Sequence, residues 1–183
     1  MRIGNANTCL AAFVIAAAVA GSVNAEDWQA RLAKELPVLG HRNWIVVADS
    51  AYPKQSAPGI ETVDTGDGQI EVLSHVLDAI KKATHVRAVV MMDAELTSVS
   101  EKDAPGVTAY RASLKKLLDQ KQVKVMLHEE IIGSLDESAR LFNILLLKTR
   151  MTIPYTSVFL QLDCAYWDGD KEKRLRIALE NKK

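Results

Sequence analysis

Residues 40–53 read GHRNWIVVADSAYP and contain one short, strongly apolar run. Residues 45–47 are consecutive β-branched amino acids, which is typical of a strand that is covered on both faces. His41 precedes this strand and Asp49 follows it, and both side chains can transfer protons. Ligands of open α/β sheets bind at the carboxyl ends of the strands, so the segment predicts an α/β fold with Asp49 placed to bind a ligand.

Apolar runs alternate with segments of helical periodicity along the rest of the chain. Further strands are predicted at 60–63, 86–92, 123–127, 141–147 and 157–162, and helices at 27–36, 70–80, 107–118 and 129–139. The strands at 86–92 and 123–127 are apolar enough to be predicted as fully buried. The last two strands are joined by a turn near 150–154 and are expected to pair as an antiparallel hairpin. We therefore predict a single three-layer α/β domain with a mainly parallel sheet plus a C-terminal β-hairpin.

The first 25 residues are typical of a secretory signal peptide. Arg2 supplies a positive charge, residues 10–20 form an apolar run, and residues 23–25 offer a small-x-small cleavage site. The apolar run is shorter than the roughly 20 residues of a membrane-spanning helix. We expect a signal peptide at 1–25, one α/β domain at 26–165 and a charged helical tail at 166–183. The mature chain is then periplasmic or secreted and has no membrane span.

Charge and cysteine content narrow the classes of partner. Without Arg2 the mature chain carries 22 basic and 23 acidic residues, so it has no basic surplus to attract nucleic acid or an anionic membrane. Cys164 is the one cysteine that remains after the signal segment, which excludes an internal disulfide. A mature chain of this length is long enough to bury one sizeable core.

Three segments, taken together, carry a family resemblance. They are Gly40-His41 with Asp49 and Pro53, then Val90-Met91-Met92 with Tyr110-Arg111, and finally His128-Glu129-Glu130 with Pro154-Tyr155-Thr156-Ser157. In order and approximate spacing they resemble the ribose pyranase and fucose mutarotase (RbsD/FucU-like) family over roughly residues 36–162. Members of that family are small sugar-anomer enzymes, so the resemblance implies a monosaccharide substrate and no cofactor or metal.

The resemblance also implies roles for individual residues. His41 matches the proton donor, and the contacts to the sugar fall on Asp49, His128, Tyr155 and Ser157. A further implication is a homo-oligomeric ring whose active sites borrow the tyrosine element from a neighbouring chain.

Two residues depart from the family pattern. Asn43 stands where the family has an aspartate two residues after the catalytic histidine, and Ser157 replaces the asparagine of a Tyr-x-Asn element. A neutral amide cannot bias the charge of His41 as a carboxylate would. A serine is shorter than an asparagine and offers one donor instead of two. These departures favour the alternative of a non-catalytic, exported sugar-binding or interaction protein on the same fold.

The chemistry of the leading hypothesis suits these residue types. Interconverting sugar anomers or ring forms requires a proton to leave the anomeric hydroxyl and another to reach the ring oxygen. Histidine, with an unperturbed pKa of roughly 6.5, has both protonation states accessible near neutral pH. A positioned acid–base group contributes on the order of 10²–10⁴ in rate. We therefore predict a cofactor-free mutarotase or pyranase that acts by acid–base proton transfer.

Each candidate residue also has a purely structural interpretation. His41 is compatible with a loop histidine bonded to the backbone, and Asp49 with an Asx cap of the following turn. His128 is compatible with the first residue of a helix, and Tyr155 with a turn tyrosine that covers the predicted hairpin.

Two other clusters have the residue types for catalysis. His41, Asp49 and His128 are suitable zinc ligands, which would fit a small metal-dependent hydrolase, but their spacing does not require a metal. Asp93 and Glu95 form a carboxylate pair after a predicted strand. Two carboxylates so placed are more typical of a solvated loop than of acid–base catalysis.

Overall fold

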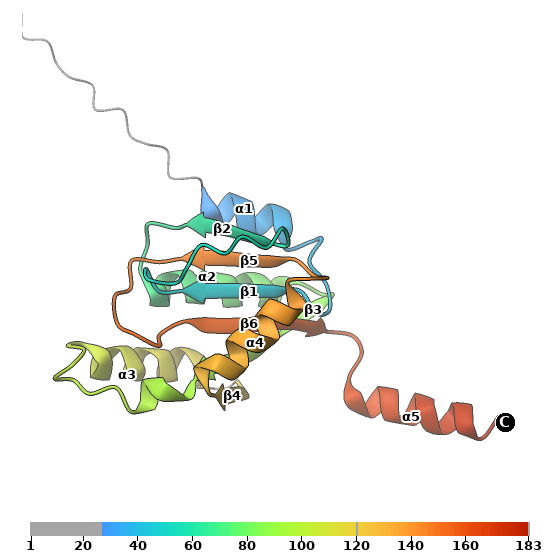
Figure 1. Ribbon diagram of the computed structural model, residues 1–183. Helices are drawn as coiled ribbons and strands as arrows, with labels where there is room; N and C mark the ends of the chain where they lie inside the picture. The colour runs from blue at the N-terminus through green and yellow to red at the C-terminus, as the bar shows by residue number, and fades with distance from the viewer. Residues whose placement is uncertain (1–26, 120, 183) are drawn as a thin grey trace, which may run out of the picture.

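The computed structural model describes residues 27–119 and 121–182. Six strands form one mixed sheet in the order β2-β5-β1-β6-β3-β4 (Figure 1). The strands are β1 Trp44–Ala48, β2 Ile60–Asp64, β3 Val86–Asp93, β4 Val123–Met126, β5 Ile144–Lys148 and β6 Val158–Cys164. The predicted signal peptide at 1–25 lies outside the described residues.

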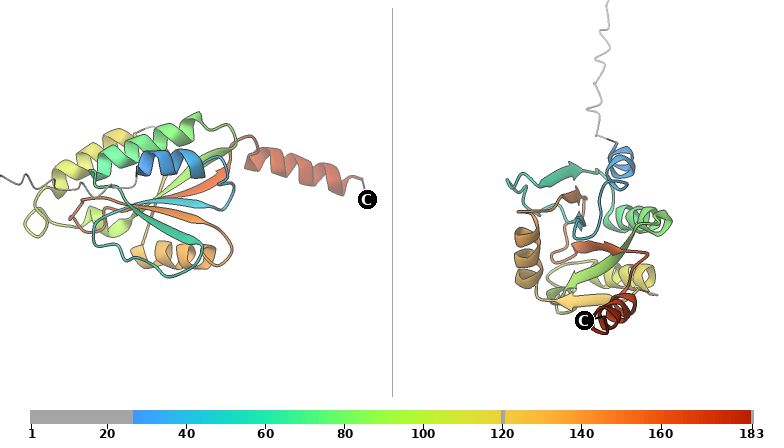
Figure 2. Two further views of the ribbon diagram at one scale, coloured as in Figure 1. Left: turned by 90° about the horizontal axis from the view of Figure 1, so that it is seen from above. Right: turned by 90° about the vertical axis from the view of Figure 1, so that its right-hand side faces the viewer.

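Helices cover both faces of the sheet, which makes three layers (Figure 2). They are α1 Trp28–Glu35, α2 Gln69–Lys82, α3 Val107–Leu118, α4 His128–Ser138 and α5 Gly169–Glu180, with a short 3-10 helix at Ala94–Thr97. The first three α-helices share one apolar cluster with the sheet, and α4 packs on the opposite face in a second cluster. This arrangement confirms the predicted α/β fold class.

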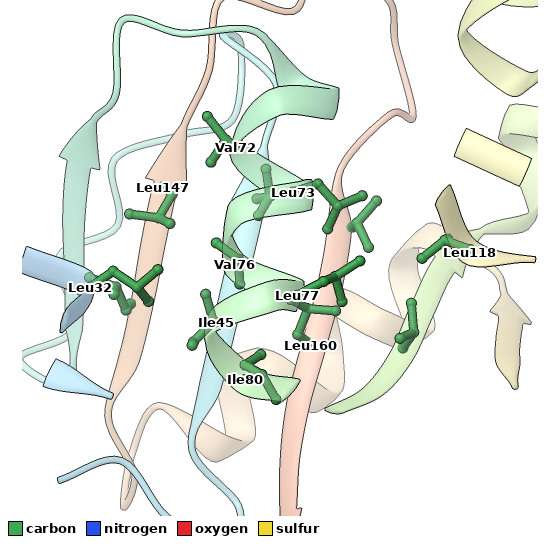
Figure 3. Packing of buried hydrophobic residues seen from close by; sticks show 14 of the residues in the cluster. Leu32, Ile45, Val72, Leu73, Val76, Leu77, Ile80, Leu118, Leu147 and Leu160 are labelled. Carbon is green, nitrogen blue, oxygen red and sulfur yellow. The ribbon is translucent and has the colours of Figure 1, made fainter. Parts of the chain in front are cut away.

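The strand β1 lies in the interior of the sheet, and both of its faces are buried. Ile45 and Val47 contribute to the cluster under α2, while Trp44, Val46 and Ala48 contribute to the cluster under α4. Every residue of β1 is buried. On the α2 side, helical spacing aligns the apolar residues of the helix over the sheet (Figure 3). Burial of such branched side chains stabilises the fold by about 1.5–3 kcal/mol each.

Two details of the predicted sheet are wrong. The strands β5 and β6 do not pair as a hairpin, because β1 lies between them, parallel to β5 and antiparallel to β6. The β-branched run of β1 is buried on both sides and takes the central place, and residues 149–157 cross over it. The strand β4 is an edge strand that pairs with β3 alone, so Lys124 and Val125 are exposed where full burial was predicted.

The C-terminal helix α5 extends away from the sheet and its helical layers (Figures 1 and 2). None of its described residues is buried. No helix in residues 27–119 and 121–182 has the length and apolar character required to cross a membrane.

Candidate active site

The five parallel strands end at one edge of the sheet, called here the carboxyl edge, where the antiparallel β6 begins. Val158 of β6 pairs with Val47 of β1 on one side and with Met92 of β3 on the other. Asp49 and Asp93 lie just after Val47 and Met92 in the chain, and Ser157 lies just before Val158. These three residues therefore meet at the carboxyl edge. This is the edge at which open α/β sheets bind ligands.

Asp49 and Ser157 are hydrogen-bonded to each other at this edge. The Ser157 hydroxyl donates to Oδ2 of Asp49 at 2.9 Å, and the Asp49 backbone N–H donates to Oγ of Ser157 at 3.2 Å. Oδ1 of Asp49 also accepts the N–H of Ala51 at 2.9 Å, which is the predicted Asx bond. Asp49 is half-buried. The structure thus brings two predicted sugar contacts together while Asp49 also shapes its own turn.

His128 is paired with a buried carboxylate. Its Nδ1 lies 3.1 Å from Oδ2 of Asp93, whose side chain is 0% exposed while that of His128 is 31% exposed. Burial raises the pKa of Asp93 to about 6, against the opposing effect of the hydrogen bond to His128. The interpretation of Asp93 as a solvated loop residue was wrong, because Asp93 is the last residue of β3, is fully buried and bonds to His128 of α4.

Glu95 caps the helix that begins at His128. Both of its carboxylate oxygens accept the His128 backbone N–H, at 3.1 Å each. A carboxylate at a helix N-terminus satisfies an otherwise unpaired donor and is stabilised by the helix dipole. Arg111 of α3 holds the segment that carries Glu95, donating to the carbonyls of Leu96 and Thr97 at 3.1 and 2.9 Å.

Tyr155 lies against the histidine. The rings of Tyr155 and His128 are edge-to-face, 5.7 Å apart between centroids, and Tyr155 is 39% exposed. Its φ of 59° is in the left-handed region, which costs a non-glycine residue of order 1–3 kcal/mol. The predicted pairing of Tyr155 with a hairpin does not occur, and the ring instead borders the site.

Buried polar side chains support the loop that carries Tyr155 and Ser157. Gln69, at the start of α2, donates to the carbonyls of Val47 and Thr156 at 2.9 and 2.8 Å. The hydroxyl of Tyr110 donates to the same Thr156 carbonyl at 2.7 Å. Tyr110, one of the residues behind the family resemblance, therefore acts as a support for this loop.

Tyr52 is a further polar group at this edge that sequence reasoning did not assign. Its hydroxyl is buried and has no hydrogen-bond partner within residues 27–119 and 121–182. Burial raises its pKa, and the negative charges of Asp136, Asp93 and Asp49 add to that effect.

His41 lies at the opposite edge of the sheet. The strand β1 separates it from Asp49, and the steps from Trp44 to Asp49 alone span about 16 Å. Its side chain is 56% exposed, and its Nδ1 lies 3.0 Å from Oδ1 of Asp163, at the end of β6. Arg87 donates to the other oxygen of Asp163, at 3.1 Å from Nε and 2.6 Å from Nη2. One chain therefore brings Asp49, His128, Tyr155 and Ser157 together, but not His41.

Asn43 shapes the turn that presents His41 without bonding to the histidine. Its Oδ1 accepts the Gly40 N–H at 2.7 Å, and its Nδ2 donates to the Asn143 carbonyl at 3.1 Å. The carboxylate that Asn43 lacks is supplied by Asp163, which is 122 positions away from His41 in the chain. A contact so distant in sequence has no local signal, whereas the edge of the sheet that His41 occupies follows from its place before β1.

The structure gives no support to the zinc hypothesis. His41 lies across the sheet from Asp49 and His128, and no group of three or more His, Cys, Asp or Glu side chains in the described part of the chain is arranged to hold a metal ion. A cavity of about 590 Å³ near the start of β3, lined by Val86 and Lys121 among others, has no histidine or carboxylate in its lining. It therefore contains none of the residues that the family resemblance assigns to the sugar.

Comparisons with known proteins agree with the observed fold. A family model described as the RbsD / FucU transport protein family matches residues 28–164. The fold is similar to that of Bacillus subtilis RbsD complexed with D-ribose, at 21% sequence identity and a TM-score of 0.53, over 73% of this chain and 91% of that chain. It is also similar to the fucose mutarotase in complex with L-fucose from Streptococcus pneumoniae, at 18% identity and a TM-score of 0.52, over 76% and 95% of the two chains. A search of curated proteins finds no significant sequence match.

Proposed function

The chain belongs to the RbsD / FucU transport protein family, and from this premise we propose that it is a cofactor-free monosaccharide mutarotase or pyranase. The observation that carries the proposal is the cluster at the carboxyl edge, where one chain gathers Asp49, Ser157, His128 and Tyr155. Carboxylate and hydroxyl groups bind sugar hydroxyls, an aromatic ring packs on the sugar, and a histidine exchanges protons at neutral pH.

The proposed reaction needs only one base and one acid. The base removes the proton of the anomeric hydroxyl, the acid protonates the ring oxygen, and the bond between the anomeric carbon and the ring oxygen breaks to give the open-chain carbonyl form. Closure on the other face of the carbonyl, or by a different hydroxyl, returns both protons and yields the other anomer or ring size. The sugar neither gains nor loses electrons, so the step requires no redox partner.

The proton donor in this proposal is His41 of a neighbouring copy. Within one chain, His41 is separated from Asp49 by the length of β1, which is too far for both to contact one monosaccharide. We therefore propose a homo-oligomer in which the His41 edge of one copy faces the carboxyl edge of the next. Such a head-to-tail contact generates a ring when the rotation closes. Tyr155 then acts together with His128 of its own chain, and His41 is the group that crosses the interface.

The test is saturation-transfer NMR of anomer exchange with ribose, fucose, galactose and glucose, using protein that begins at Glu26. Acceleration for at least one sugar is the expected result, and it should be lost in His41→Ala. The matched control is His75→Ala, an exposed histidine on α2 that packs on Trp28. Exchange at the wild-type rate in a folded His41→Ala variant would remove the assigned role of His41.

The alternative is a non-catalytic sugar-binding protein. It is favoured by the bond between Ser157 and Asp49, which already occupies polar atoms that the catalytic proposal assigns to the sugar. This alternative predicts line broadening of one sugar without faster anomer exchange in the same experiment.

We also propose that the protein acts outside the cytoplasm. The support is the signal-like composition of residues 1–25. Expression of the full chain in a Gram-negative host should yield a product that begins near Glu26 in the periplasmic fraction. A full-length product confined to the cytoplasm would contradict this.

A further inference from the structure

The buried carboxylate of Asp93 is the polar group at the carboxyl edge whose burial is hardest to explain by stability. Its side chain is 0% exposed. Oδ2 is bonded to His128, but Oδ1 is buried without a hydrogen-bond partner among the described residues. Burying a carboxylate with an unpaired oxygen is destabilising, and such groups cluster at functional sites.

The geometry of the pair determines which nitrogen of His128 is available. A carboxylate only accepts hydrogen bonds, so the bond at 3.1 Å places a proton on Nδ1 of His128. The neutral ring then has a bare Nε2 on its other side, and Nε2 makes no hydrogen bond to the described part of the chain. A bare Nε2 is a proton acceptor, and the carboxylate stabilises the imidazolium that forms when it is protonated.

Two other contacts fix the orientation of the histidine. Glu95 holds the His128 backbone N–H with both oxygens, which anchors the first residue of α4. Tyr155 packs edge-to-face on the imidazole. Asp93 on Nδ1, Glu95 on the backbone and Tyr155 on the ring therefore leave little freedom for the ring to rotate.

We propose that Asp93 is a positioning residue that holds His128 in the Nδ1–H tautomer, so that Nε2 of His128 is the base that takes the proton of the anomeric hydroxyl. This inference rests on the proposed mutarotase or pyranase function and adds to it. His41 of the neighbouring copy delivers a proton to the ring oxygen, and His128 accepts one from the anomeric hydroxyl. When the ring closes again, each histidine returns to its starting protonation state.

The test combines Asp93→Asn with the tautomer of His128. Long-range ¹⁵N NMR of the imidazoles in wild-type protein should show His128 protonated on Nδ1 and bare on Nε2. In Asp93→Asn the amide can donate to Nδ1, so a shift toward the Nε2–H tautomer is expected. The rate of anomer exchange at saturating sugar should fall about 100-fold or more, with little change in the sugar concentration that gives half-saturation.

Asp163→Asn is the matched control, because it makes the same chemical change beside His41. It should leave the His128 tautomer unchanged. A wild-type His128 with its proton on Nε2, or an Asp93→Asn variant with unchanged tautomer and exchange rate, would overturn the inference. Absence of sugar exchange in the wild type would instead refute the proposed function, while the wild-type tautomer still decides whether Asp93 positions His128.

Discussion

Two histidine–aspartate pairs stand at opposite edges of the same sheet, in contrasting environments. The His41 side chain is 56% exposed and that of Asp163 is 28% exposed, and Asp163 also pairs with Arg87, whereas His128 pairs with a carboxylate that is fully buried. Burial tends to raise the pKa of Asp163, but hydrogen bonds from Arg87, the Cys164 backbone and His41 outweigh it and hold that pKa below its usual range. Burial raises the pKa of Asp93 to about 6. The pKa values of the two aspartates are therefore shifted in opposite directions, upward by burial at Asp93 and downward by hydrogen bonds at Asp163.

This contrast suits a division of labour in proton transfer. The exposed His41 can exchange protons with water and so be reprotonated. The buried carboxylate of Asp93 is shielded from water and holds His128 in one tautomer. In this low-dielectric environment its electrostatic effect on the reacting groups is stronger than it would be in water. The two pairs cannot both contact one sugar within a single chain, because the length of β1 separates them.

The largest expected effect comes from mixing two inactive variants. His41→Ala and His128→Ala should each lose about 100-fold or more of the exchange rate, because each lacks one proton-transfer group. If each site combines His41 of one copy with His128 of the next, unfolding and refolding an equal mixture restores both groups in about one quarter of the sites. The measurement is anomer exchange of the mixture relative to wild type.

The control for this experiment is an equal mixture of His41→Ala with Asp93→Asn in place of His128→Ala. It should recover in the same way, because Asp93 belongs to the same edge as His128. A mixture of His128→Ala with Asp93→Asn should not recover, since both changes damage the same edge. Lack of recovery in every mixture, with light scattering showing intact oligomers, would refute the shared site.

The second largest expected effect is the dependence of the unfolding free energy on pH that Asp93, the buried partner of His128, causes. A carboxyl whose pKa is raised on folding stabilises the fold fully below its unfolded pKa, and this contribution is lost as the pH rises through the folded value. For Asp93 the window runs from the ordinary value of 3.8 to about 6. Between pH 4 and 7.5 the wild type should therefore lose up to about 3 kcal/mol of unfolding free energy relative to Asp93→Asn. Denaturant titrations of both proteins measure it, and parallel pH profiles would contradict it.

At the pair of His41 and Asp163, the dependence of stability on pH should have the opposite sign and be smaller. The pKa of Asp163 is lowered, so its contribution to stability is present above its unfolded pKa and is lost as the pH falls below about 4. At pH 7 we expect wild type to exceed Asp163→Asn by at most about 1 kcal/mol, because Arg87 and His41 are well solvated. The difference should shrink in 1 M salt, as measured by denaturant titration with and without salt. A difference that does not respond to salt would show that packing, not charge, accounts for it.

Local sequence patterns predict which residues meet at the carboxyl edge. They do not predict the aspartates that pair with the two histidines. The β-branched run of β1 placed Asp49 at a strand end, and His128, Tyr155 and Ser157 each adjoin a predicted strand. Parallel strands end at one edge, so these residues meet whatever the detailed strand order. The central position of β1 between β5 and β6 depends on competition for burial across the whole sheet, which no single segment reveals.

Asp93 and Asp163 owe their roles to segments distant in the chain. Asp93 precedes a polar, acidic loop, and its partner His128 lies 35 positions further along the chain, at the start of α4. Asp163 meets His41 only because β6 runs antiparallel beside β1. The carboxylate beside His41 comes from β6, and not from position 43, where the sequence has an asparagine.

The smallest expected effect on stability concerns backbone strain, which both edges contain. Arg42, next to His41, has a φ of 76°, and Tyr155, next to His128, has a φ of 59°. Glycine adopts such angles without steric cost but loses more chain entropy on folding, so Arg42→Gly and Tyr155→Gly should each change stability by less than about 1 kcal/mol. Only Tyr155→Gly removes a ring that contacts the buried pair, and only it should lower sugar exchange markedly. Thermal unfolding and anomer exchange of both variants test this, and equal activity losses would show that strain at the two edges, and not the Tyr155 ring, supports catalysis.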